Sequence, residues 1–127
     1  MITLILRETS FKNQQHLLYF DMTNHHLIAK ELKENLENNL PGLIQRVILY
    51  GSYIKGKANE NSDLDFLLLL NNDIDWETKR VIYDISNNIN IKYDVWVDIN
   101  WISKNDLNSL RGKQPFVQNA LAEGITV

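Results

Sequence analysis

The stretch that decides the fold lies in the middle of the chain, where residues 50–66 read YGSYIKGKANENSDLDF. Residues 43–50 form a short β-rich segment that runs directly into Gly51-Ser52. Residues 64–70 are an apolar run of strand length, closed by the turn signal Asn71-Asn72-Asp73. We therefore expect two strands joined by a glycine-containing loop or a single helical turn, with polar residues at both ends of the loop.

Asp63 and Asp65 stand at the start of the second expected strand. Two residues apart on a strand, their side chains leave the same face with Cα atoms about 6.5–7 Å apart. Asp is disfavoured in strands and like charges on one face repel, so a divalent cation between the carboxylates would stabilise the pair. Because the chain has no Cys and no clustered His, an all-oxygen ligand set favours Mg²⁺, or Mn²⁺, over zinc. On these residues alone, two aspartates that merely begin a strand remain an equal alternative.

Gly51 and Ser52 follow the first strand at the kind of turn whose free backbone N–H groups bind phosphate. Glycine lets a phosphate approach the backbone closely, the Ser52 hydroxyl adds a donor, and Gly56 keeps the following turn tight. An ordinary turn with a serine cap is the alternative. A metal-bound phosphate ligand becomes a specific hypothesis only because both elements occur together.

The remaining elements follow from the spacing of apolar residues. We expect helices over 24–40, stopped by Pro41-Gly42, and over about 76–90, capped by Asp75. Residues 93–101 alternate as a half-buried strand, with Asp94 and Asp98 on one face. Ser103 is expected to cap a short helix through Leu110, and residues 114–122 form a last helix. Residues 1–22 are the hardest to place, with 10–20 a candidate short helix. The order predicts an α/β (α+β) fold, a small mixed β-sheet with flanking helices.

The chain has 127 residues, 44% hydrophobic and 23% charged, which fits a single domain over residues 1–127. Residues 1–22 are an N-terminal extension without an assigned role. The net charge of −3 argues against a general nucleic-acid binder. No window approaches the roughly 18 apolar residues of a membrane span, and the N-terminal run lacks the features of a signal peptide. A cytoplasmic protein is therefore expected.

Residues 50–66 together resemble the signature of the polymerase-β-like nucleotidyltransferases, most closely their minimal branch of stand-alone domains often paired with a helical toxin. The spacing agrees throughout, including the small Ala58 after the second glycine. Tyr53 departs from the pattern, because the minimal branch often has Arg there, whereas Lys55 keeps a positive charge. Residues 116–125 are also similar to the close of these domains, where a Glu-Gly pair precedes a strand-like tail.

The resemblance implies the nucleotidyltransferase fold, with Gly51, Ser52 and Lys55 binding the nucleotide phosphates. It also implies a third carboxylate on the next long strand. Asp98 is the candidate, five positions before Ser103, and Asp94 is its rival on the same face. The catalytic and metal ligands would be Asp63, Asp65 and Asp98, holding two Mg²⁺ ions.

The function implied is metal-dependent transfer of a nucleoside monophosphate, AMP from ATP, to a hydroxyl acceptor such as a Tyr of a partner toxin. The chain is too short to add an acceptor-binding domain, so a helical toxin partner or a second subunit of a homo-oligomer would supply that site. One alternative is a catalytically weak nucleotide-binding antitoxin that silences its partner by contact. Another is a transferase acting on a small molecule such as an aminoglycoside.

Overall fold

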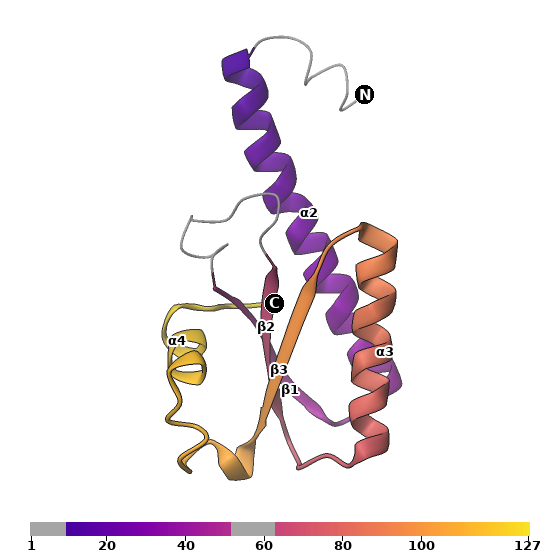
Figure 1. The fold of residues 1–127 in the computed structure, drawn as a ribbon, viewed down its shortest axis with the longest axis vertical. Coiled ribbons are helices and arrows are strands. Elements are labelled where there is room, and N and C mark those ends of the chain that lie inside the picture. Colours follow the sequence, from indigo (N-terminus) through magenta and orange to yellow (C-terminus); the bar gives the residue numbers. More distant parts are fainter. Residues whose placement is uncertain (1–9, 52–62) are drawn as a thin grey trace.

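The computed structural model describes residues 10–51 and 63–127, with side chains described from residue 24 onward. The helices and strands follow one another in the expected order (Figure 1). They are α2 (Ser10–Asn39), β1 (Ile44–Tyr50), β2 (Leu64–Leu70), α3 (Trp76–Tyr93), β3 (Val97–Ser103), a 3-10 turn (Lys104–Asp106), α4 (Pro115–Glu123) and β4 (Ile125–Thr126). In these described ranges, no helix is long and apolar enough to cross a membrane.

The four strands form one mixed sheet in the order β3-β2-β1-β4. β1 is antiparallel to β2 and to β4, whereas β2 and β3 are parallel. The end of β1 and the starts of β2 and β3 therefore meet at one end of the sheet (Figure 1). The mixed sheet with flanking helices confirms the fold class predicted from the sequence.

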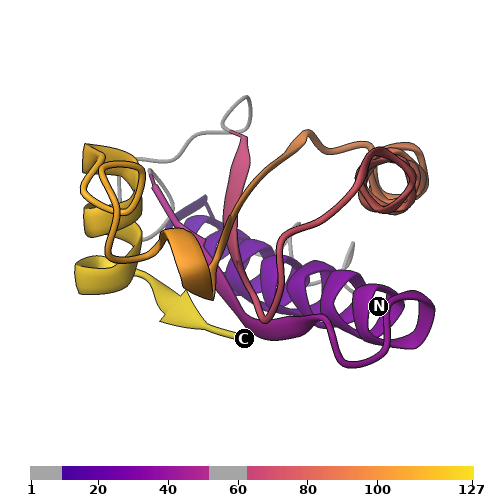
Figure 2. The ribbon, with the colours of Figure 1, turned by 90° about the horizontal axis from the view of Figure 1, so that it is seen from below.

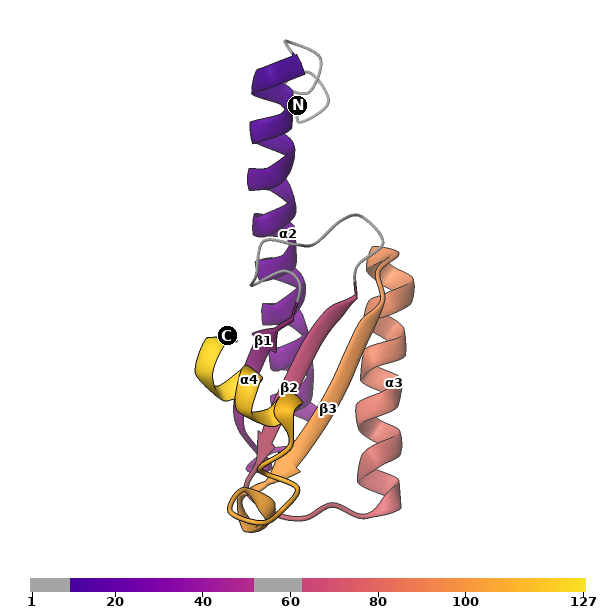
Figure 3. The same cartoon turned by 60° about the vertical axis from the view of Figure 1, so that its left-hand side comes forward.

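Alternate strand residues face two separate apolar cores, because side chains along a strand point to opposite faces in turn. One core lies between the sheet and the helices α2 and α3, and contains Leu32, Phe66 and Ile82. The other lies under α4 and contains Ile48, Leu67 and Val117. Figures 2 and 3 show α4 on one side of the sheet, with α2 and α3 on the other.

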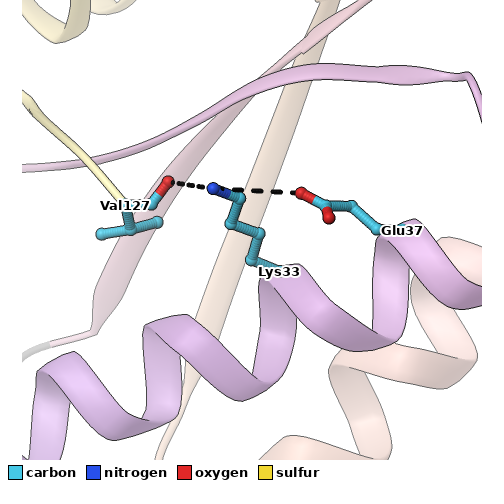
Figure 4. A network of polar contacts seen from close by, with 3 residues as sticks. All are labelled: Lys33, Glu37 and Val127. Atoms are coloured by element: carbon cyan, nitrogen blue, oxygen red, sulfur yellow. Dashed lines mark hydrogen bonds and ion pairs between the residues drawn. The ribbon is translucent and has the colours of Figure 1, made fainter.

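The C-terminal tail forms the fourth strand, as the resemblance implied. The backbone N–H of Val127 donates to the carbonyl of Val47 at 2.9 Å. Lys33 of α2 donates to the main-chain oxygen of Val127 at 2.8 Å and lies 3.9 Å from the carboxylate of Glu37 (Figure 4). These contacts tie the tail both to β1 and to the helix behind the sheet.

The expectation that the first clear helix begins at Asn24 was wrong. Residues 10–39 form one continuous helix, α2, rather than a short helix followed by a longer one. No glycine or proline interrupts this range, so nothing in the backbone requires a break there. Pro41-Gly42 does end it, with Gly42 at φ +79°.

The predicted strand over residues 93–101 begins too early. Tyr93 is the last residue of α3, and Asp94 closes that helix in the left-handed conformation with φ 51°. The alternation of burial nevertheless continues through this turn, because Tyr93 and Val95 still pack against the core that α2 and α3 cover. The alternating pattern of residues 93–97 therefore reflects burial across a turn and not an extended strand.

The helix expected from Ser103 to Leu110 is only a single 3-10 turn, and Ser103 is the last residue of β3. The backbone N–H of Ser109 donates to the Asp106 carbonyl at 3.1 Å, and its hydroxyl donates to the same oxygen at 2.6 Å. A local side-chain bond of this kind competes with helix continuation. The last helix, α4, lies within one residue of its predicted bounds, and Asp75 caps α3 as predicted through a 2.8 Å bond from the Thr78 N–H.

Candidate active site

Gly51 lies against the Asp65 carboxylate. Gly51 follows β1 with φ +87°, a conformation that L side chains rarely adopt. A Cβ at Gly51 would overlap Asp65 Oδ2 and would lie 3.1 Å from Asp65 Cγ. An L residue at 51 would therefore be strained by its backbone conformation and would also push the Asp65 carboxylate away from the main chain.

The sheet brings Asp65 and Asp98 side by side. They are direct Cα partners in the parallel pairing of β2 and β3, so their side chains leave the same face of neighbouring strands about 4.8 Å apart. Asp63 lies just before β2 and is exposed. Asp94 lies outside the strand, at the end of α3. Of the two rivals for the third carboxylate, Asp98 is thus the one that the sheet places beside Asp65.

The electrostatics of the site centre on Asp65. Burial raises its pKa to about 6, and the negative charges of Asp98 and then Asp63 act in the same direction. Among the described residues, the charges that act on this carboxylate are therefore both negative. A cation would relieve the repulsion, and the all-oxygen donor set fits Mg²⁺ or Mn²⁺.

The carboxylates of Asp63, Asp65 and Asp98 are not grouped closely around one point in this structure. Within the described ranges, no three acidic or histidine side chains are grouped closely enough to hold an ion as they stand. Asp63 and Asp98 are exposed and Asp65 is half-buried, so the two outer carboxylates have freedom to move inward. Ser52 and Lys55, predicted to bind phosphate, lie outside the described residues, as does Gly56.

Asn90, in the last turn of α3, fixes the connection from α3 to β3. Its side-chain Oδ1 accepts a 2.7 Å hydrogen bond from the N–H of Val97, the residue before Asp98. Its main-chain carbonyl accepts from the N–H groups of Asp94 and, at 3.3 Å, of Val95. Asn90 therefore helps to fix the start of β3, which carries Asp98.

A main-chain hydrogen bond made by Leu64, which lies between Asp63 and Asp65, also joins the starts of β2 and β3. The N–H of Leu64 donates to the carbonyl of Trp96 at 2.9 Å. The Trp96 side chain is 64% exposed. Only the three-dimensional pairing of β2 with β3 identifies this bond, because it joins two main-chain groups.

The chain is similar to known proteins over most of its length. A family model described as polymerase beta nucleotidyltransferase matches residues 28–127. Two Methanocaldococcus jannaschii proteins, each named "Putative protein adenylyltransferase", are similar in sequence. One is 36% identical over 70 residues, which are 55% of this chain and 71% of that protein. The other is 29% identical over 101 residues, which are 80% of this chain and 95% of that protein.

Solved structures share the fold. One belongs to a toxin–antitoxin system crystallised with AMP-PNP; its TM-score is 0.54 at 22% identity, over 77% of this chain and 70% of that one. Another is the spectinomycin adenyltransferase of Enterococcus faecialis with ATP and spectinomycin, with a TM-score of 0.53 at 21% identity. That match covers 66% of this chain and 36% of the enzyme. Given the family model's coverage of residues 28–127 and the carboxylates that the sheet assembles within it, this chain belongs to the polymerase beta nucleotidyltransferase family.

Proposed function

We propose that this nucleotidyltransferase transfers AMP from ATP to a hydroxyl group of a partner protein, with Asp63, Asp65 and Asp98 as the ligands of the required divalent ions. The observation that carries the proposal is the direct pairing of Asp65 with Asp98 beside Gly51. ATP as donor and protein as acceptor are supported by the names of the two archaeal relatives.

The residues divide into an inner and an outer set. Asp65 is half-buried against Gly51, whereas Asp63 and Asp98 are exposed and reachable by a substrate. When bound, Mg²⁺ ions neutralise the triphosphate and lower the pKa of the acceptor hydroxyl. Gly51, together with Ser52 and Lys55, would hold the phosphates at the end of β1.

The transfer is a single displacement at the α-phosphorus of ATP. The acceptor oxygen bonds to the α-phosphorus while the bond from that phosphorus to the bridging oxygen breaks, and pyrophosphate leaves with the bonding electrons. Asp98 takes the proton of the acceptor hydroxyl, because it is the exposed carboxylate next to Asp65. Asp65 keeps its negative charge for the ion.

The acceptor is proposed to be a Tyr of a helical toxin partner. The support is the resemblance of residues 50–66 to the minimal branch, together with the fold shared with the toxin–antitoxin protein crystallised with AMP-PNP. In this proposal the chain is the antitoxin of the pair, and it silences its partner by covalent modification.

Incubation with ATP labelled on either the α- or the γ-phosphate tests the reaction. With Mg²⁺ and a protein that co-purifies with the chain, α-label should appear in protein and γ-label should not. Asp63→Asn combined with Asp65→Asn should abolish the transfer, whereas Asp73→Asn, an exposed acid in the turn after β2, should not. Full silencing of the partner by the double variant would overturn the catalytic proposal in favour of inhibition by contact.

A further inference from the structure

Tyr50 and Asn100 form a polar bridge across the face of the sheet that carries the carboxylates. Tyr50 ends β1 and is the Cα partner of Asp65, and Asn100 lies on β3 two residues beyond Asp98. The side-chain Nδ2 of Asn100 donates to the Tyr50 hydroxyl oxygen at 3.4 Å. Since β2 lies between β1 and β3, this bond spans the central strand.

The bridge marks the border between the carboxylates and the apolar core under α4. On this face, the row of Tyr50, Asp65 and Asp98 is followed by a row that contains Leu67 and Asn100. Leu67 is fully buried in the core under α4, whereas Tyr50 only packs against the edge of that core. The hydroxyl therefore lies where the apolar side chains end and the acidic ones begin.

The bond from Asn100 leaves the hydroxyl proton of Tyr50 available to donate elsewhere. An amide nitrogen has only donors, so the Tyr50 oxygen must accept from Asn100, and the phenolic proton points elsewhere. Burial raises the pKa of Tyr50, the bond from Asn100 partly offsets this, and the charges of Asp65 and Asp98 raise it further. Tyr50 pairs with Asp65, and Asp65 pairs with Asp98, so both carboxylates stand in the same row of the sheet as Tyr50.

We propose that Tyr50, held by Asn100, is a positioning residue that donates its hydroxyl proton to the Asp65–Asp98 pair and so orients these carboxylates toward a bound divalent ion. The inference rests on the metal site proposed above and adds a residue that the metal does not touch. Hydrogen-bond donors behind a metal ligand fix which oxygen faces the ion, and their loss typically costs about 10- to 100-fold in metal affinity.

A structural role alone would give a different result. A hydroxyl that only supports packing would change the melting temperature of the metal-free protein and leave its metal affinity unchanged. A positioning role changes the metal affinity and the rise in melting temperature that the metal produces. The two readouts together separate the roles.

The experiment measures Mn²⁺ binding by the electron paramagnetic resonance of free Mn²⁺, in the full chain and its variants. Tyr50→Phe should weaken binding about tenfold or more, and Asn100→Leu, which frees the phenol, should weaken it less. The matched control is Tyr83→Phe, at a tyrosine on α3 that is 51% exposed and packs edge-on against Trp101; it should change affinity by less than about twofold.

Unchanged Mn²⁺ affinity in Tyr50→Phe, alongside clear binding by the unsubstituted chain, would overturn this inference and leave the proposed function intact. Absence of Mn²⁺ binding by the unsubstituted chain would instead contradict the proposed metal site and the inference with it. If Tyr50→Phe lowers only the melting temperature of the metal-free protein, Tyr50 is a packing residue and the inference fails.

Discussion

Replacing Gly51 with alanine should both destabilise the fold and displace the Asp65 carboxylate in the site. The structure allows the two contributions to be estimated separately. At φ +87° an L residue is strained by about 1–2 kcal/mol. The added Cβ also overlaps Asp65 Oδ2, so the carboxylate must turn out of its rotamer, which costs about 0.5–1.5 kcal/mol more. We expect a loss of about 1.5–3.5 kcal/mol in the free energy of unfolding. We also expect the carboxylate to move by roughly 1 Å, enough to slow transfer about 100-fold.

Gly42→Ala is the matched control, because Gly42 has a similar φ of +79° and nothing within 4 Å of an added Cβ. This variant should show the backbone strain alone, about 1–2 kcal/mol, with normal transfer. Urea denaturation measures the two losses, and label transfer from ATP measures the activities. The reasoning is refuted if Gly51→Ala loses no more stability than Gly42→Ala and transfers AMP at the normal rate.

Three further predictions follow from the same geometry. Asp65 has a pKa of about 6 in the folded chain against about 3.8 unfolded, so the folded state binds this proton more tightly, and without metal the stability should fall as the pH rises from about 4 to 6. Because water screens this half-exposed group, we expect a fall of only about 1 kcal/mol, which Asp65→Asn should remove in melting curves recorded with a chelator. Asn90→Ala leaves a buried strand N–H unpaired and should cost about 1–3 kcal/mol in urea denaturation, whereas Asn87→Ala, at an exposed position of the same helix, should be close to neutral; equal losses would contradict the role of Asn90. Asp98→Asn should abolish transfer, while Asp94→Gly, at the left-handed end of α3, should keep full activity and unchanged or slightly higher stability; the reverse pattern would make Asp94 the third carboxylate.

The parts of the fold that could be predicted are those in which one local signal determines one element. The apolar run of β2 and the aspartate cap of α3 are local signals of this kind, and both were confirmed. The boundary between α3 and β3 was not predictable from burial, because exposed and buried residues alternate from Tyr93 to Ile99 through a helix end, a left-handed turn and a strand. Ile91 is 82% exposed within α3, and apolar spacing therefore gave no sign that the helix continues past Asn90.

The site shows the same division. Asp63 and Asp65 are predicted from their spacing, because two carboxylates one strand repeat apart are costly unless a cation binds between them. Asp98 is predicted from the resemblance to the nucleotidyltransferases, and all three stay predictions as metal ligands. The sequence did not identify Asn90, Tyr50 or Asn100, since an asparagine or tyrosine in a strand or at a helix end has many uses. Their roles come from contacts between separate strands and helices, which exist only once β1, β2 and β3 are paired.

Diffraction from crystals grown with Mn²⁺ and AMP-PNP tests most directly the claim that the carboxylates of β2 and β3 hold a metal-bound nucleotide. The anomalous scattering of manganese locates the ion without reference to any assumed chemistry. We predict a manganese peak bonded to Asp65 and Asp98, with the phosphates at the end of β1 beside Gly51. Manganese bound away from these carboxylates, or AMP-PNP bound elsewhere on the chain, would contradict the account.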